Sequence, residues 1–187
     1  DSFEHNPWSY NERASIGTLA GAAWRPRGWL ATEDYCTTKS ASRNAPGRKP
    51  LRNRHGRCDL LLETKITTYA IEAKHVWQPI SKGSSLMVKG VQRALVDARL
   101  LTKDEGNHRI AATFTAPYLM LSERSNGSID LADVRLRVCD WLDENVHEKF
   151  SNYAYVFPRE VGQYISKSGN RLFPGIVLTI QSIRSRH

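Results

Sequence analysis

The chain has 187 residues, of which 40% are hydrophobic and 25% are charged, a composition typical of a globular domain rather than a disordered or fibrous protein. No segment approaches the run of about 18 apolar residues that spans a bilayer, and the N-terminal residues lack the pattern of a signal peptide. The three cysteines are widely spaced and form no CxxC or Cys/His cluster, so we expect reduced thiols, no zinc site, no membrane partner and a cytoplasmic location.

The first element in chain order is a helix. Residues 6–25 carry Asn6 as a candidate cap, Pro7 at the first helical position and apolar residues at helical spacing. Residues 28–35 are ambiguous and fit either a short strand or a helical turn.

A strongly basic segment follows. Between Cys36 and Cys58 the sequence contains no acid, and it is rich in Ser, Gly, Asn and Pro, so we expect a mobile loop. Its seven bases account for nearly all of the net charge of +8, and they are candidate nucleic-acid contacts because cations near phosphates release condensed counterions. A loop kept basic for solubility is the alternative. The seven are Lys39, Arg43, Arg48, Lys49, Arg52, Arg54 and Arg57.

The remaining elements alternate between strands and helices. Two strands are expected near 58–63 and 69–77, and the later elements are a helix over 85–103, a strand over 108–121, a helix over 130–146 capped by Asp130, and strands over 152–158 and 172–183, with a turn over 164–170. This order predicts an α/β (α+β) fold with a central mixed sheet flanked by helices. We expect one domain over 1–187.

Charged residues interrupt the two apolar strands. If their hairpin turns between Lys65 and Ile66, Asp59 lies opposite Glu72, and Lys74 shares that face of the sheet. Because Lys-Ile-Thr-Thr is not a preferred turn sequence, a longer loop with diagonal pairing is the alternative. Two carboxylates this close repel each other unless a cation lies between them, and a divalent ion with oxygen ligands is one solution. A structural salt bridge is the alternative.

A second acid-x-Lys triplet, Glu63-Thr64-Lys65, lies at the expected turn and has no upstream acid as a cross-strand partner. We interpret it as ordinary hairpin polarity.

An Asp at a strand start followed by Glu-x-Lys in the next strand resembles the PD-(D/E)xK phosphodiesterase superfamily, the restriction-endonuclease-like nucleases. The order of elements over residues 8–118 resembles that superfamily as well, whereas residues 119–187 form an α/β extension that we cannot match. The chain departs from the motif in having Cys58 instead of Pro before Asp59, although many members of the superfamily lack that Pro.

The resemblance implies a restriction-endonuclease-like core with a Mg²⁺ ion, or Mn²⁺ in its place, held by Asp59, Glu72 and the carbonyl of Ala73. Lys74 would then orient the attacking water. In some branches a Glu on the first helix completes the site, which makes Glu12 a candidate, although Ser9 and Glu12 also form a capping-box pattern. RecB-like members carry a Gln on the helix after the Glu-x-Lys strand, which makes Gln92 a candidate, although Val96 replaces the accompanying Tyr and a surface Gln is the alternative.

We therefore expect a metal-dependent nuclease that acts on DNA rather than RNA. The alternatives are a non-catalytic nucleic-acid-binding module on the same fold, a toxin-type nuclease domain of a larger effector acting on RNA, and an interaction domain whose basic loop contacts an acidic partner. A homodimer is compatible with the resemblance.

Overall fold

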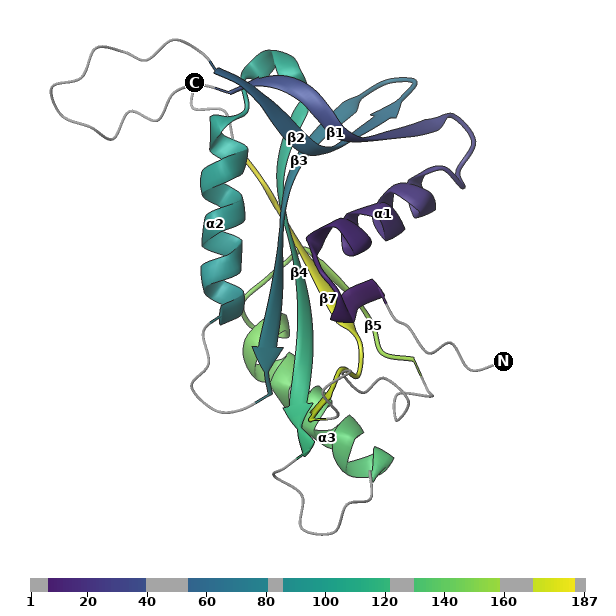
Figure 1. Cartoon of the computed structure of the whole chain (residues 1–187), viewed down its shortest axis with the longest axis vertical. Helices are drawn as coiled ribbons and strands as arrows, with labels where there is room; N and C mark the ends of the chain where they lie inside the picture. Colours follow the sequence, from purple (N-terminus) through teal and green to yellow (C-terminus); the bar gives the residue numbers. More distant parts are fainter. Residues whose placement is uncertain (1–6, 40–53, 81–85, 122–129, 159–169, 184–187) are drawn as a thin grey trace, which may run out of the picture.

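A mixed β-sheet runs through the computed structural model, with helices on both of its faces (Figure 1). The structure describes residues 7–39, 54–80, 86–121, 130–158 and 170–183. Within these ranges the sheet has seven strands in the order β1-β2-β3-β4-β7-β5, and β6 pairs with β4. The predicted α/β class with a mixed sheet and flanking helices is confirmed.

The bounds of the elements follow in chain order. They are the 3-10 helix η1 (Pro7–Ser9), α1 (Glu12–Ala23), β1 (Trp29–Lys39), β2 (Arg54–Thr64), β3 (Thr68–Pro79), α2 (Leu86–Leu100), η2 (Lys103–Glu105), β4 (His108–Met120), α3 (Leu131–Leu142), η4 (Asp143–His147), β5 (Tyr153–Val156), β6 (Arg171–Leu172) and β7 (Ile176–Ser182). In the described part of the chain no helix is long and apolar enough to cross a membrane.

The first α-helix begins later than predicted. Pro7 opens a single 3-10 turn, and the α-helix starts only after Asn11, whose backbone is extended and whose side chain accepts a hydrogen bond from the amide of Ala14. The cap prediction for Asn6 was therefore wrong for the α-helix, because Asn11 satisfies the first amides of α1.

The strands β1 and β2 reach into both ends of the segment that was predicted as a basic loop. The ambiguous residues 28–35 belong largely to β1, and the ladder with β2 runs from Trp29 opposite Thr64 to Lys39 opposite Arg54. The expected loop from Cys36 to Cys58 thus has strand at both ends. Among the predicted nucleic-acid contacts, Lys39 lies on β1 and Arg57 is exposed on β2. Arg54 begins β2, but its side chain is not described, and Arg43, Arg48, Lys49 and Arg52 lie outside the described residues.

The predicted hairpin register is confirmed. Leu60 lies opposite Ile71 and Glu63 lies opposite Thr68, so the turn is centred between Lys65 and Ile66. The amide of Thr64 donates to the carbonyl of Thr67 and closes the turn. Glu63 and Lys65 are both exposed there, which agrees with hairpin polarity for the second acid-x-Lys triplet.

The two faces of β3 contact different helices. Ile71 and Ala73 pack in one core cluster with Ile16 and Ala20 of α1. Residues of the opposite parity face α2, as shown by Val76, whose side chain lies against Gly90 of α2. Side chains alternate along a strand, so Glu72 and Lys74 face α2.

The C-terminal region adds a third helix and the far edge of the sheet. Asp130 caps α3 as predicted, because its carboxylate accepts from the amide of Ala132. The single strand expected over 172–183 is divided into β6 and β7. Pro174 has no amide to donate, and Gly175 approaches the Val156 carbonyl so closely that a Cβ would overlap it, which interrupts the strand. The turn predicted over 164–170 lies almost entirely outside the described residues.

Candidate functional site

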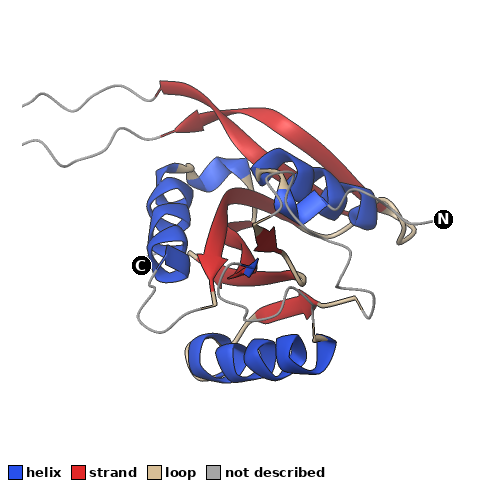
Figure 2. Ribbon diagram, turned by 60° about the horizontal axis from the view of Figure 1, so that its bottom comes forward, coloured by secondary structure: helices blue, strands red, loops and turns tan. Residues whose placement is uncertain are grey.

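The strands β2 and β3 separate where the charged residues lie. Their ladder ends at Leu60 and Ile71, while β2 continues as a partner of β1 alone. In Figure 2 the paired β1 and β2 extend beyond the rest of the sheet. From Glu72 onward β3 has lost this neighbour, so backbone groups along its edge need other partners.

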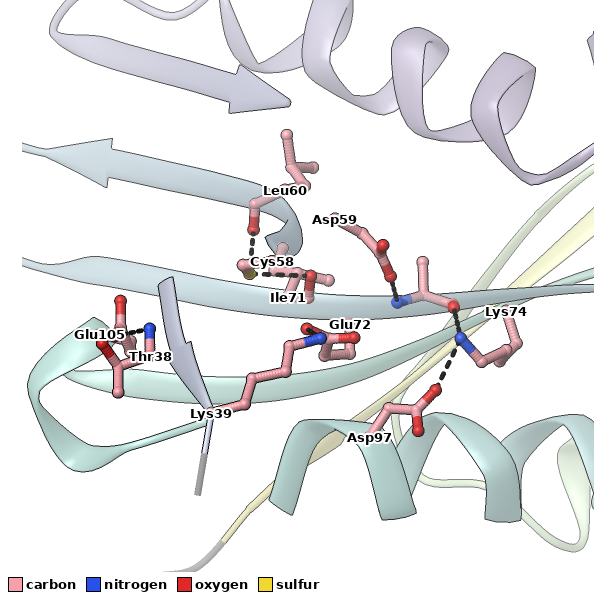
Figure 3. A network of polar contacts seen from close by, with 11 residues as sticks. Thr38, Lys39, Cys58, Asp59, Leu60, Ile71, Glu72, Lys74, Asp97 and Glu105 are labelled. Atoms are coloured by element: carbon pink, nitrogen blue, oxygen red, sulfur yellow. Dashed lines mark hydrogen bonds and ion pairs between the residues drawn. The ribbon is translucent and has the colours of Figure 1, made fainter. Parts of the chain in front are cut away.

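Asp59 provides one of these partners. Its Oδ2 atom accepts a hydrogen bond of 2.7 Å from the amide of Ala73 (Figure 3). The neighbouring Cys58 is buried, and its Sγ atom contacts the carbonyl oxygens of Ile71 at 3.2 Å and Leu60 at 3.4 Å. The side chains of two successive residues thus replace the interrupted ladder. Burial, reinforced by the charge of Glu72, raises the pKa of the Cys58 thiol to about 12.

Glu12 provides the next partner along β3. Its Oε2 atom accepts from the amide of His75 at 3.2 Å, so the side chain points into the sheet rather than back to the helix start. Of the two interpretations left open by the sequence, the inward-facing one is confirmed, and the capping box is wrong because Asn11 rather than Ser9 caps α1. Burial raises the pKa of Glu12, the positive charge of Lys74 opposes this, and the carboxylate of Asp59 adds to it. Glu12 therefore belongs to the same electrostatic cluster as Asp59 and Lys74.

Glu72 is the most deeply buried acid of the cluster, with a side chain that is 3% exposed. The Nζ atom of Lys39 on β1 lies 2.8 Å from its Oε1 atom. Burial raises the pKa of Glu72 to about 7, against the opposing effect of Lys39 and with a further contribution from Asp59. A buried carboxylate of this kind is stable as an anion only with a cation beside it.

Lys74 joins β3 to α2. Its Nζ atom lies 2.8 Å from Oδ2 of Asp97 and donates to the carbonyl of Ala73 at 2.8 Å. Burial alone would lower the pKa of Lys74, but Asp97, Glu12 and Asp59 together outweigh it and raise the pKa. The lysine is therefore held charged beside the carboxylates.

The predicted convergence of Asp59, Glu72 and Lys74 takes a different form from the one expected. The register is as predicted, but Asp59 bonds to the backbone between Glu72 and Lys74 instead of facing the two side chains across an intact ladder. The reason is that the β2–β3 ladder covers only Leu60–Glu63 of β2, and the residues before Leu60 pair with β1 alone. The three residues still line one short stretch of β3 (Figure 3).

A polar groove adjoins Lys74 on the α2 side of the sheet. Its volume is about 470 Å³, and its lining includes both Lys74 and Gln92. The Gln92 side chain is exposed, which agrees with a surface Gln, and its catalytic role stays a prediction. The other lining residues are Lys89, Arg93, Val96 and Asp97.

Two features of the site were missed from the sequence. Lys39 was predicted as a nucleic-acid contact, whereas the structure pairs it with Glu72, and no local pattern shows a contact between distant strands. Asp97, the partner of Lys74, was not predicted. Its signal is its place on α2 beside the buried Ala94 and Ala98, which lie on the side of the helix that faces the sheet.

The acidic cluster fits a divalent cation in charge and in donor chemistry. When ionised, Glu12, Asp59, Glu72 and Asp97 carry four negative charges, and Lys39 and Lys74 carry two positive charges, which leaves an excess of two. Carboxylate and backbone carbonyl oxygens are the ligands that Mg²⁺ prefers. Oδ2 of Asp59 accepts from the Ala73 amide, Oε1 of Glu72 lies beside Nζ of Lys39, and the Ala73 carbonyl accepts from Lys74. Among the described residues no three Asp, Glu, His or Cys side chains are grouped as a metal-binding set.

No protein-family model matches the chain, and neither the curated proteins nor the solved structures contain a significant match to it.

Proposed function

We propose that this protein is a metal-dependent nuclease that hydrolyses phosphodiester bonds of DNA. The observation that carries the proposal is the gathering of Asp59, Glu72 and Glu12 around β3, beside a charged lysine, which leaves an excess of negative charge when the carboxylates are ionised. The order α1, β1, β2, β3, α2, β4 and the positions of Asp59, Glu72 and Lys74 also support membership of the PD-(D/E)xK superfamily.

Asp59, Glu72 and the carbonyl of Ala73 would hold Mg²⁺, or Mn²⁺ in its place, and Glu12 is the candidate for an additional ligand. When bound, the ion supplies a nucleophile at neutral pH from coordinated water and neutralises charge that develops on the phosphate. Glu72 must be ionised to take part. The contact with Lys39 lowers the pKa of Glu72 against the effect of burial. This ion pair therefore favours the ionised form that a metal ion would bind.

Lys74 would act as a positively charged hydrogen-bond donor and not as a metal ligand. Its ammonium group donates to the Ala73 carbonyl and pairs with Asp97, so its position is fixed from both β3 and α2. A charged donor held in place stabilises negative charge on an attacking water or a phosphate oxygen without reorganisation during the reaction.

The basic residues around the site suit a polyanionic substrate. Arg57 is exposed on β2, in the part of that strand that extends past β3. It is therefore a candidate contact for the phosphate backbone.

Cleavage assays on several substrates test the proposal. Plasmid, linear duplex and single-stranded DNA, and RNA, are incubated with wild type in Mg²⁺, Mn²⁺ or EDTA, beside Lys74→Ala. We expect cleavage of DNA that requires metal and is at least about 100-fold slower in Lys74→Ala, since removal of one transition-state donor costs about that factor.

The alternatives predict other results. A non-catalytic module binds DNA in a salt-dependent way and leaves every substrate intact. A toxin-type domain cleaves RNA instead of DNA. A protein-interaction domain neither binds nor cleaves nucleic acid, and that result would contradict the proposal outright.

A further inference from the structure

The groove beside Lys74 has a chemistry that the proposed reaction does not use. It is bounded by Lys74 of β3 and by one face of α2, where Lys89, Arg93 and Asp97 follow one another at intervals of four residues. Residues four apart on a helix lie on the same side, about one turn of 5.4 Å from one another. The groove therefore has a row of charged groups along its length.

The charge of this row is positive and directed to solvent. Asp97 is engaged with Lys74, whereas Lys89 and Arg93 are both exposed. Among the described residues, no carboxylate forms an ion pair with either of them. Three cationic groups and one anion line the groove, while the cluster around Asp59 and Glu12 is acidic. Two adjacent regions of opposite charge thus meet at Lys74.

We propose that this groove binds the phosphodiester backbone of DNA next to the phosphate that is cleaved, through Lys89 and Arg93. The inference rests on the proposed function for its placement relative to the cleaved bond, but binding itself requires no metal. A polymer explains the arrangement better than a small anion does, because the two cations lie one turn apart along an open groove rather than around one point. The Gln92 amide, which lines the same groove, can donate to a phosphate oxygen.

Equilibrium binding in EDTA tests the inference without cleavage. A fluorescein-labelled DNA duplex is titrated with wild type, with the double variant Lys89→Gln/Arg93→Gln, and with the control Arg25→Gln/Arg27→Gln, over a series of salt concentrations. Both double variants remove two exposed charges, so they change the net charge equally. Thermal unfolding of all three proteins verifies that they are folded.

We expect the groove variant to lower the slope of log K against log salt by about 2, since each phosphate contact contributes about 0.9. Its affinity at moderate salt should fall at least about 10-fold, and the control should keep the wild-type slope. Equal losses in both variants, or no loss in the groove variant, would overturn the proposal. Displacement of the duplex by an equal phosphate concentration of inorganic phosphate would also overturn it, because the groove would then be a small-anion site.

The outcome separates the groove from the proposed activity. If wild type binds DNA through Lys89 and Arg93 but cleaves no substrate, the binding role of the groove is supported and the nuclease proposal fails. If wild type cleaves DNA while the groove variant binds as wild type does, the nuclease proposal stands and the groove fails. Absence of DNA binding by wild type overturns both.

Discussion

The Nζ atom of Lys39 lies 2.8 Å from Oε1 of Glu72 and joins the end of β1 to the middle of β3. The lysine is 24% exposed and the carboxylate 3%, so the negative charge is the more deeply buried partner. Keeping a buried carboxylate charged costs free energy of folding, and carboxylates of this kind are concentrated at functional sites. The pair therefore makes Glu72 the residue around which both the stability and the proposed chemistry of the site can be tested.

Glu72 should make stability depend on pH. Its pKa is about 7 in the folded protein, against an ordinary value of 4.5, so between these values the folded state binds a proton that the unfolded state has lost. Unfolding free energy then decreases as pH rises from about 4.5 to 7, by about 3 kcal/mol from this group. Urea denaturation in EDTA measures this effect. Between pH 4.5 and 7 the unfolding free energy of Glu72→Gln should rise relative to that of wild type by the same amount. Parallel pH profiles would contradict the prediction.

Asp59 has two roles that can be separated by substitution. In Asp59→Asn the amide oxygen can still accept from Ala73, so the unfolding free energy should change by less than about 1 kcal/mol. Asp59→Ala leaves that amide without its partner and should cost about 1 to 3 kcal/mol. Metal-dependent cleavage should be lost in both. If Asp59→Asn cleaves at the wild-type rate, Asp59 is only a backbone cap for β3.

Gly90 permits the close approach of α2 to β3. A Cβ at this position would overlap Cγ2 of Val76 and lie 3.2 Å from Cγ2 of Thr113. We expect Gly90→Ala to destabilise the protein by about 1 to 3 kcal/mol, because α2 must move outward. Gly21→Ala is the matched control, since a Cβ there meets nothing within 4 Å and alanine favours the helix by about 1 kcal/mol. Denaturation midpoints should shift in opposite directions, and shifts of the same sign would disprove close packing at Gly90.

The three thiols should differ in reactivity. Cys36 and Cys139 are exposed and Cys58 is buried, with a pKa of about 12 caused by its burial and by Glu72. Because the thiolate is the reactive form, a thiol reagent at pH 8 should label two cysteines in the native protein and three after denaturation. Rapid labelling of Cys58 in the native state would mean that the end of the β2–β3 ladder opens readily.

The sequence predicted those features of the site that depend on local periodicity. The register considered for β2 and β3, with a turn between Lys65 and Ile66, is the one in the structure. A shift by one residue would turn Leu60 and Ile71 out of the core. The helical stripe that places Glu12 inward was likewise visible. Asn11 was missed as the helix cap because Asn6 and Pro7 form an equally good start signal earlier in the chain.

The remaining features depend on contacts between distant segments. The exposed residues of β1 gave no clear alternation, so the strand was recognised only through its ladder with β2. The contact of Lys39 with Glu72 follows from that ladder and from the separation of β2 from β3. Neither event leaves a periodic pattern in the sequence, and the same is true of the pairing of Lys74 with Asp97.

The two acid-x-Lys triplets offer the most direct test of the central claim. Initial rates of plasmid cleavage are measured against Mg²⁺ concentration for wild type, Glu72→Gln and Glu63→Gln, at equal protein concentration. We expect saturable, metal-dependent cleavage by wild type and Glu63→Gln, and a rate at least about 100-fold lower for Glu72→Gln. Equal rates for all three proteins, or cleavage that persists in EDTA, would contradict a metal site built on Glu72.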